Sequence, residues 1–270
     1  MPTNDRAAAV WSDVQAIRAQ APLVHNITNY VVMNTTANAL LALGASPVMA
    51  HAEEEVEEMA GIARALVLNI GTLSAPWIEA MVKAGRVAGR NGRPIILDPV
   101  GAGATRFRTV AARRLLRDAP PAVIRGNASE IRALHTAEQD TKGVDSTHGS
   151  EEALDAAQAL AGHYDCVVSV SGATDLIVSA TAVIRVSNGH PLMPRVTGLG
   201  CTATALTGAF AAVNPSPLLA AAHAMAVMGI AGEIAATRSA GPGTFQVHFL
   251  DALYLLQESD IRERLKLEEG

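Results

Sequence analysis

Apolar residues follow two alternating patterns along this chain. Short continuous apolar runs are typical of strands that are buried on both faces of a sheet. We predict such strands at 22–28, 46–50, 65–71, the start of 93–103, 122–127 and three positions within 165–189. Segments that we interpret as helices separate or follow them, at 6–20, 31–44, 53–63, 75–92, 109–118, 128–135, 151–164 and almost throughout the chain after residue 200.

This alternation predicts an α/β fold. Strands that alternate with helices are joined by right-handed crossovers, which give a mainly parallel central sheet with helices on both faces. The strands within 174–189 are expected to add an antiparallel hairpin. The polar stretch 136–149 is the best candidate for a surface loop, and the chain shows neither an internal repeat nor a strong linker. We therefore expect a single domain over residues 1–270.

The composition excludes several classes of protein. Hydrophobic residues make up 49% of the 270 residues and charged residues 17%, whereas a disordered chain combines high charge with few apolar residues. Because only 3% of the residues are aromatic, Ala, Val, Leu and Ile must fill the core. The net charge of −5 and the scarce aromatic residues argue against nucleic acid as a partner, since nucleic-acid domains usually carry a basic patch and stacking aromatics.

Three features bear on where the protein works. The N-terminus lacks the basic start and apolar core of a signal peptide. Residues 218–236 are about as long as a membrane span, but His223 and Glu233 interrupt them and most of their apolar residues are Ala, so we expect a buried helix. The distant Cys166 and Cys201 do not make a disulfide framework or a metal cluster and fit a reducing compartment. We expect a cytoplasmic protein that does not engage a membrane.

Candidate chemistry follows the predicted strands, because ligands of open parallel sheets bind at the carboxyl ends of the strands. The sharpest candidate is the turn Thr197–Thr202, which leads into an Ala-rich helix. Gly198 and Gly200 would let backbone amides approach an anion closely, and the dipole of the helix would add to the attraction. This turn would hold a phosphate without a lysine, unless it is only a tight connection.

Charged and polar residues follow the other strands. Asp98 and Glu130 carry the hard oxygen ligands that Mg²⁺ prefers, although each by itself also fits a turn or a solvated helix end. Arg125 would pair either with a phosphate or with one of these carboxylates. Ser171 would donate a hydrogen bond to a phosphate, or simply make a turn before Gly172.

The cysteines differ in their expected roles. Cys201 stands at the predicted start of a helix, where the dipole and free amides favour a thiolate. It would act as a base, bond a substrate hydroxyl, or only pack as a small residue. Cys166 lies within a buried strand and is interpreted as structural. His25, in the segment His-Asn-Ile-Thr-Asn, is interpreted as a hydrogen-bonded structural residue.

Standard motifs for other chemistry do not fit. The chain has no G-x-x-x-x-G-K-[ST] phosphate loop, no H-E-x-x-H metal site and no G-x-S-x-G nucleophile elbow. Residues 198–203 match G-x-G-x-x-A, but Pro191 and Pro194 lie upstream in place of a buried strand. The acidic residue that a dinucleotide site needs about 20 positions further on is also missing.

Taken together, the chain resembles the hydroxyethylthiazole kinase family of the ribokinase-like superfamily from about Val24 to about Leu250. The resemblance is specific because many segments match in order. These segments are VHNITNYVVMNTTANALLALGASPVMAHA (24–52), LVLNIGTL (66–73), PIILDPVGAGATRFRT (94–109), IRGNASEI (124–131), VTGLGCTATAL (196–206) and GPGTF (241–245).

The resemblance implies transfer of a phosphoryl group from ATP, with Mg²⁺, to the alcohol of 4-methyl-5-(2-hydroxyethyl)thiazole in thiamine salvage. It also implies a ribokinase-like fold without a lid and a homotrimer with active sites between subunits. Its site residues map here as follows: Met49, Gly198 and, more weakly, Asn26 to the substrate; Arg125 and Ser171 to ATP; Asp98 and Glu130 to Mg²⁺; Gly198, Gly200 and Cys201 to an anion hole; and Cys201 to the reacting hydroxyl.

Two departures and three alternatives accompany this hypothesis. Ser171 stands where the family typically has Thr, and Leu199 where it usually has Ala. The serine keeps the hydroxyl, whereas the bulk of Leu199 would change how the substrate packs. A related hydroxymethylpyrimidine or pyridoxal kinase, an ATP- or ADP-dependent NAD(P)H-hydrate dehydratase on the same fold, and a binding protein without catalysis stay open as alternatives.

Overall fold

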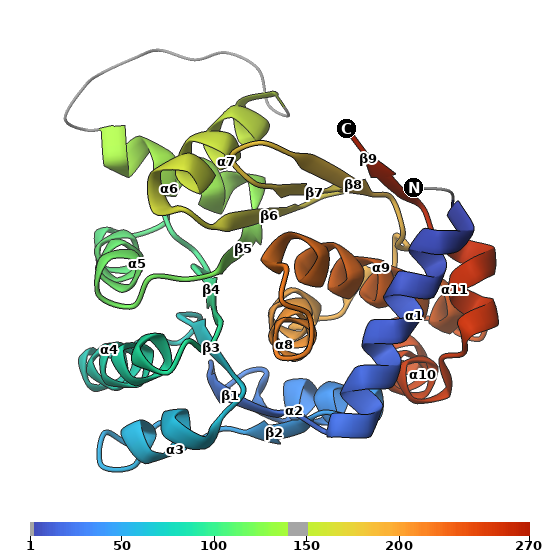
Figure 1. Cartoon of the computed structure of the whole chain (residues 1–270), viewed down its shortest axis with the longest axis horizontal. Helices are drawn as coiled ribbons and strands as arrows, with labels where there is room; N and C mark the ends of the chain where they lie inside the picture. The colour runs from blue at the N-terminus through green and yellow to red at the C-terminus, as the bar shows by residue number, and fades with distance from the viewer. Residues whose placement is uncertain (1–2, 140–150) are drawn as a thin grey trace.

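The computed structural model describes residues 3–139 and 151–270, and all of its strands belong to one open sheet (Figure 1). The strands lie in the order β2-β1-β3-β4-β5-β6-β7-β8-β9. Their bounds are β1 (Leu23–Ile27), β2 (Ser46–Val48), β3 (Ala65–Asn69), β4 (Ile95–Asp98), β5 (Val123–Asn127), β6 (Val167–Ser171), β7 (Asp175–Val178), β8 (Val183–Val186) and β9 (Leu267–Glu269). The described residues therefore contain no separate lid sheet.

The sheet confirms the predicted topology. Strands β2 to β6 pair in parallel, whereas β6, β7, β8 and β9 pair antiparallel. The hairpin expected at 174–189 is the pair β7 and β8. Strand β9 was not predicted, because its sequence Leu-Glu-Glu is short and carries no apolar run.

Helices cover both faces of the sheet (Figure 1). One face carries α3 (Val56–Ile62), α4 (Ala75–Arg90), α5 (Arg106–Asp118), α6 (Ala128–Gln139) and α7 (Glu151–Tyr164). The other carries α1 (Thr3–Gln20), α2 (Met33–Leu43), α8 (Leu199–Ala211), α9 (Pro217–Ala236), α10 (Pro242–Leu255) and α11 (Glu258–Arg264), with the short 3-10 helix η1 (Met193–Arg195) between β8 and α8.

Two cores lie on either side of the sheet, because successive side chains of a strand point to opposite faces. On β3, Leu66 and Leu68 belong to one core and Val67 to the other. Helix α8 packs closely on the second face at Gly208, where a Cβ would lie 2.8 Å from Val67 Cγ2. This close packing holds α8 against β3.

Helix α9 is long and apolar enough to cross a membrane, but most of its residues are buried inside the protein. The two polar residues that interrupt it have partners. His223 Nδ1 lies 2.6 Å from Asp13 Oδ2, and Glu233 Oε1 accepts hydrogen bonds from Asn188 and from Lys266 Nζ. Burial among other elements explains the apolar sequence of α9 as that of a core helix.

Some predicted boundaries were wrong. The helix predicted at 109–118 begins at Arg106, because Thr105 Oγ1 caps it by accepting a bond from the amide of Arg108 at 3.3 Å. The helix predicted at 128–135 continues to Gln139. The loop predicted at 136–149 is therefore helical over its first residues, and its remainder from 140 on lies outside the described residues.

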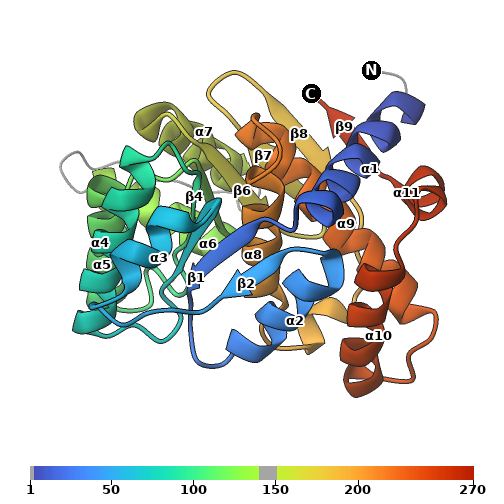
Figure 2. The ribbon, with the colours of Figure 1, turned by 60° about the horizontal axis from the view of Figure 1, so that its bottom comes forward.

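The N-terminal helix and the C-terminal strand lie side by side (Figure 2). Arg6 Nη1 donates to the carbonyl of Leu267 at 3.0 Å, and Arg6 Nε lies 3.6 Å from Glu269 Oε1. These contacts help to position helix α1. They come from β9, a strand that was not predicted from the sequence.

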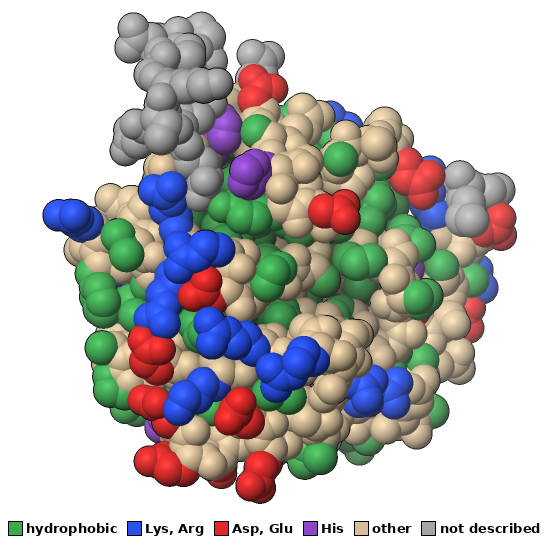
Figure 3. Space-filling model, turned by 60° about the vertical axis from the view of Figure 1, so that its left-hand side comes forward, with side chains coloured by type: hydrophobic (Ala, Val, Ile, Leu, Met, Phe, Trp, Pro, Cys, Tyr) green, Lys and Arg blue, Asp and Glu red, His purple; other side chains and the backbone are tan. Residues whose placement is uncertain are grey.

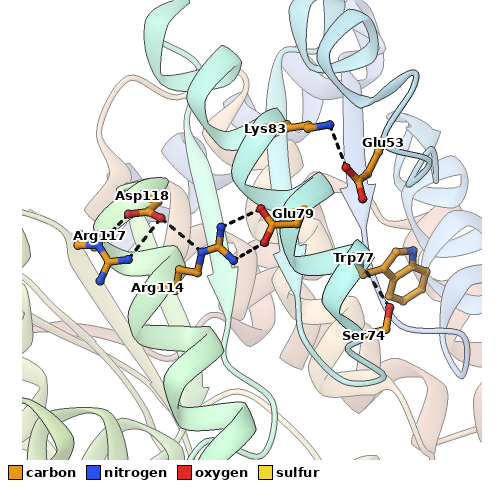
Figure 4. A network of polar contacts seen from close by, with 8 residues as sticks. All are labelled: Glu53, Ser74, Trp77, Glu79, Lys83, Arg114, Arg117 and Asp118. Atoms are coloured by element: carbon orange, nitrogen blue, oxygen red, sulfur yellow. Dashed lines mark hydrogen bonds and ion pairs between the residues drawn. The ribbon is translucent and has the colours of Figure 1, made fainter.

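The outer surface of α4 and α5 carries several ion pairs, one of which joins the two helices (Figure 4). Arg114 Nη2 donates to Glu79 Oε2 at 2.8 Å, and Arg114 Nε lies 3.5 Å from Asp118 Oδ2. Lys83 Nζ lies 2.9 Å from Glu53 Oε2. Charges of both signs are mixed over this face (Figure 3). The face is not the one-sign basic surface that nucleic-acid binding favours.

Candidate active site

A cavity of about 860 Å³ opens at the carboxyl ends of β4, β5 and β6, beside the start of α8. Seven predicted site residues line it: Asp98, Arg125, Glu130, Ser171, Gly198, Gly200 and Cys201. They come from four separate parts of the chain, and the parallel sheet brings them together because its strand ends share one edge.

The start of α8 forms one wall of this cavity. Gly198 is the residue before the helix and has a φ of 84°, a left-handed conformation that favours glycine. A Cβ there would also lie 2.6 Å from Val32 Cγ1. The first N–H groups of a helix have no partner within the helix, so those following Gly198 are available to an anion. This geometry fits the predicted anion hole of Gly198, Gly200 and Cys201.

Arg125 on β5 faces this helix start. A Cβ on Gly200 would lie 2.9 Å from Arg125 Nη1, so the guanidinium lies against the glycine backbone. Its Nε is buried and finds no hydrogen-bond partner among the described residues. A fixed positive charge and the amino end of a helix therefore point to the same part of the cavity, which favours a phosphate group.

Asp98 ends β4 and is 2% exposed. Its Oδ2 accepts hydrogen bonds of 2.7 Å from Asn69 Nδ2 and from Thr204 Oγ1. Burial raises the pKa of Asp98 to about 6, although the positive charge of Arg125 works in the opposite direction. A buried carboxylate without a cation is costly, and a bound metal ion would offset that cost.

Glu130 lies in the first turn of α6, and its two carboxylate oxygens bind backbone amides. Oε1 accepts from Gly101 at 2.8 Å and Oε2 from Asn127 at 2.8 Å. The residue is buried rather than solvated. It therefore holds the Gly-rich loop after β4 against β5, while its remaining lone pairs stay available for another ligand.

These residues fit a magnesium ion better than a transition metal. Among the described residues, no group of three or more His, Cys, Asp or Glu side chains is placed to hold a metal ion. Mg²⁺ is usually bound by one or two carboxylates together with substrate phosphates and waters. Asp98 and Glu130 both line the cavity and would supply the carboxylates of such a set.

Cys201 lies beside the anion hole, but its environment opposes the thiolate that we expected at a helix start. Burial and the charge of Asp98 raise the pKa of Cys201 to about 11. Asn29 Nδ2 donates a hydrogen bond to Sγ at 3.4 Å. At neutral pH the side chain is therefore a neutral thiol, which suits a hydrogen-bonding role more than that of a base.

Ser171 lines the cavity, whereas the two remaining substrate-binding candidates do not. Ser171 ends β6, lines the cavity and donates to the carbonyl of Gly126 at 3.3 Å. Asn26 is buried within β1, and Met49 follows β2; neither lines the cavity of this chain.

Two residues interpreted as structural are buried as expected. His25 Nε2 lies 2.7 Å from the carbonyl of Ala50, and burial lowers the pKa of this histidine. Cys166 is buried, which raises its pKa to about 12, but it lies just before β6 rather than within that strand.

Sequence reasoning missed three residues beneath the cavity. Asn29 and Asn69 form a chain of hydrogen bonds that joins Cys201 to Asp98, and Thr204 donates to the same carboxylate from α8. Two of them carried a usable signal, because each is a polar residue that follows or ends a buried apolar run. Thr204 lies inside a helix and gave no such signal.

A second cavity of about 480 Å³ lies where β3, β4 and β5 begin, at the opposite edge of the sheet. Arg64, Arg93 and the connection between α8 and α9 line it, and no carboxylate does. It contains none of the predicted site residues, so the larger cavity is the candidate active site.

Comparison with known proteins agrees with this architecture. A family model described as the hydroxyethylthiazole kinase family matches residues 14–259. Hydroxyethylthiazole kinase from Syntrophus aciditrophicus is 63% identical over 261 residues, which cover 96% of this chain and 97% of that protein. The corresponding protein from Oleidesulfovibrio alaskensis is 59% identical over 258 residues, with 96% and 97% covered.

Solved structures show the same fold. Hydroxyethylthiazole kinase from Pyrococcus horikoshii is 48% identical and superposes with a TM-score of 0.91, covering 97% of this chain and 99% of that one. Pyridoxal kinase from Staphylococcus aureus in complex with pyridoxal is 16% identical, with a TM-score of 0.66 and coverage of 92% and 97%, which shows the ribokinase-like fold alone. By sequence and by fold, this chain belongs to the hydroxyethylthiazole kinase family.

Proposed function

We propose that this chain, as a single catalytic domain over residues 1–270, transfers the terminal phosphoryl group of ATP to the hydroxyl of 4-methyl-5-(2-hydroxyethyl)thiazole. The products are the thiazole phosphate, a precursor for thiamine, and ADP. The observation that carries the proposal is the start of α8, where free amides, the guanidinium of Arg125 and the thiol of Cys201 meet in one cavity. Membership of the family supplies the substrate class.

Arg125 and Ser171 hold the ATP phosphates in this proposal. Arg125 has a buried Nε without a partner, and its Nη1 lies over Gly200. Ser171 lines the same cavity. Its hydroxyl donates only a 3.3 Å hydrogen bond to the carbonyl of Gly126, and it could donate to a phosphate oxygen instead. Asp98 and Glu130 would hold Mg²⁺, which neutralises charge on the phosphate oxygens when it is bound.

The amides after Gly198 act on the group in transfer. Charge accumulates on the oxygens of the phosphoryl group in the transition state, and donors fixed before the reaction stabilise it without reorganising. The left-handed Gly198 sets the direction of these amides. Because the transition state is loose, the alcohol need not lose its proton early. The neutral Cys201 thiol therefore orients the hydroxyl rather than deprotonating it.

The alcohol side of the site is completed by a second chain. Met49 and Asn26 are the substrate-binding candidates that do not line the cavity of their own chain. Tyr30 is 67% exposed and Val31 62% exposed, next in sequence to Val32, whose side chain lies against Gly198, and such exposed apolar residues favour an interface. We infer a cytoplasmic homotrimer with each active site between two subunits. Sedimentation equilibrium should give the mass of three chains; a monomer at active concentrations contradicts this inference.

An ADP-release assay tests the central proposal. With Mg²⁺ and ATP, the hydroxyethylthiazole should support turnover far better than hydroxymethylpyrimidine or pyridoxal. Mass spectrometry should detect the phosphorylated thiazole, which a dehydratase would not form. ATP and thiazole binding without release of ADP would indicate a binding protein and overturn the proposal.

A further inference from the structure

A line of side-chain amides runs beneath the cavity and ends at the Cys201 thiol. Asn29 lies just after β1 and Asn69 ends β3, which pairs with β1. Both are buried, with 4% and 1% of their surface exposed. Asn29 Nδ2 donates to Asn69 Oδ1 at 2.8 Å and to Cys201 Sγ at 3.4 Å. Hydrogen bonds through these two side chains therefore link the carboxyl end of β3 to the Cys201 thiol.

Two backbone amides fix the direction of both side chains. The amide of Val31 donates to Asn29 Oδ1 at 3.1 Å, and the amide of Gly71 donates to Asn69 Oδ1 at 2.9 Å. A backbone N–H only donates, so each side-chain oxygen must face it and each NH₂ must face the other way. The NH₂ of Asn29 is thereby directed at Cys201, and the NH₂ of Asn69 at Asp98, 2.7 Å from its Oδ2.

The close fit around Asn29 shows that this direction is built into the fold. A Cβ on Gly71 would lie 2.5 Å from Asn29 Nδ2, so only glycine leaves room for the amide. Both partners of the Asn29 NH₂ group are in place, and a rotated amide would set NH₂ against the Val31 N–H. Side chains held in this way are already in their functional conformation, so little conformational entropy is lost when a ligand binds.

The Cys201 thiol keeps hydrogen-bonding capacity that Asn29 does not use. Cys201 Sγ accepts from Asn29, and the same sulfur lines the cavity beside the anion hole. Burial and Asp98 keep the thiol protonated. Asn29 uses neither the S–H nor the second lone pair of the sulfur. A substrate hydroxyl in the cavity can therefore accept a hydrogen bond from the S–H or donate one to the sulfur.

We propose that Asn29 is a positioning residue, which is held by Asn69 and the Val31 amide and which fixes the Cys201 thiol toward the substrate hydroxyl. The proposal rests on the role given to Cys201 above. It adds that the thiol acts only while Asn29 holds it. Asn29 then affects turnover through Cys201, without binding ATP.

A double-mutant cycle tests this dependence. Asn29→Ala should lower kcat about tenfold and leave the KM for ATP within about twofold of the native value. In a Cys201→Ala background, the same change should lower kcat by less than about twofold, because the group through which Asn29 acts is gone. Equal losses of kcat in both backgrounds would overturn the proposal, as would an unchanged kcat for Asn29→Ala.

A second measurement does not depend on turnover. Asn29→Asp has almost the same size, still accepts from Val31, and replaces the donor beside Cys201 with an anion. Iodoacetamide should therefore alkylate Cys201 about tenfold more slowly in this variant than in the native protein at the same pH. The matched control is Asn38→Asp, which adds the same charge at an exposed position on α2 and should leave the rate unchanged.

The two measurements separate the inference from the proposed function. If the native protein fails to phosphorylate the thiazole, the proposed function fails, whereas slower alkylation of Asn29→Asp still supports the contact between Asn29 and the thiol. If alkylation is unchanged in Asn29→Asp, Asn29 does not hold the thiol and the inference is overturned. Thermal unfolding of each variant shows whether it is folded before either result is used.

Discussion

The guanidinium of Arg125 lies against the backbone of Gly200, so closely that a Cβ on the glycine would come within 2.9 Å of Arg125 Nη1. The two residues are far apart in sequence, on β5 and in the first turn of α8. Their approach puts a positive charge over free helix amides without a lysine. The nucleotide site therefore depends on the absence of a side chain at position 200 as much as on the arginine.

Gly200→Ala should weaken ATP binding with little effect on folding. The new Cβ meets the tip of a flexible side chain, so Arg125 moves away at small cost to stability. Loss of one charged hydrogen bond is worth about 2 kcal/mol, which raises the KM for ATP by more than about tenfold. Steady-state kinetics and thermal unfolding measure both effects. A normal KM for ATP would show that Arg125 does not bind the nucleotide from this position.

Gly198→Ala should be destabilising as well as damaging to activity. The left-handed backbone of Gly198 costs about 1–3 kcal/mol for other residues, and the methyl group would lie 2.6 Å from Val32 Cγ1. Urea unfolding should show this loss. The matched control is Gly89→Ala in α4, where no atom lies within 4 Å of the new Cβ. It should raise stability by about 0.5–1 kcal/mol. Equal effects of the two changes would contradict the special role of Gly198.

Asp98→Asn should abolish efficient turnover and yet stabilise the protein at neutral pH. The folded pKa of Asp98 is about 6, above the ordinary value of 3.8, so the folded state holds the proton more tightly than the unfolded state does. Asp98 therefore lowers stability as pH rises from about 4 to about 6, and the loss persists above that range. Two pKa units correspond to about 3 kcal/mol, which sets the upper limit of the gain. An asparagine oxygen can still accept from Asn69 and Thr204.

Urea unfolding with a chelator between pH 4 and pH 8 measures this gain. The stabilisation by Asp98→Asn should be largest at pH 7 to 8 and should shrink toward pH 4. A gain that is the same at every pH would show that ionisation of Asp98 is not its cause. A Mg²⁺ titration of activity tests the metal role separately, and a normal Mg²⁺ dependence in this variant would remove Asp98 from the metal site.

Cys201→Ala should slow turnover about tenfold without abolishing it. The thiol, with its pKa raised to about 11, is a poor base, so most of the rate enhancement comes from the anion hole and Arg125. The control is Cys166→Ala, which removes the other cysteine from a buried position away from the cavity. Complete loss of activity in a folded Cys201→Ala protein that still binds ATP would show that the thiol acts as an essential base.

The fold was largely predictable because buried strands and glycine turns leave clear local patterns. The parallel strands, the β7–β8 hairpin and the helices that separate them follow from those patterns. Strand β9 did not, because Leu267, Glu268 and Glu269 form a strand only by pairing with β8. The extension of α6 to Gln139 was missed for a similar reason, since its last residues are polar and mark a loop as readily as a helix.

The candidate site was also predictable only in part. The chain by itself determined which residue types follow the strands, and so it pointed to Asp98, Arg125, Glu130 and the turn from Gly198 to Cys201. Only the tertiary structure decided their relations. It buried Cys201 beside Asp98 and so opposed the expected thiolate, and it joined Asn29 and Asn69 beneath both. The physical reason is that pKa values and hydrogen-bond directions depend on neighbours that the fold brings from distant parts of the chain.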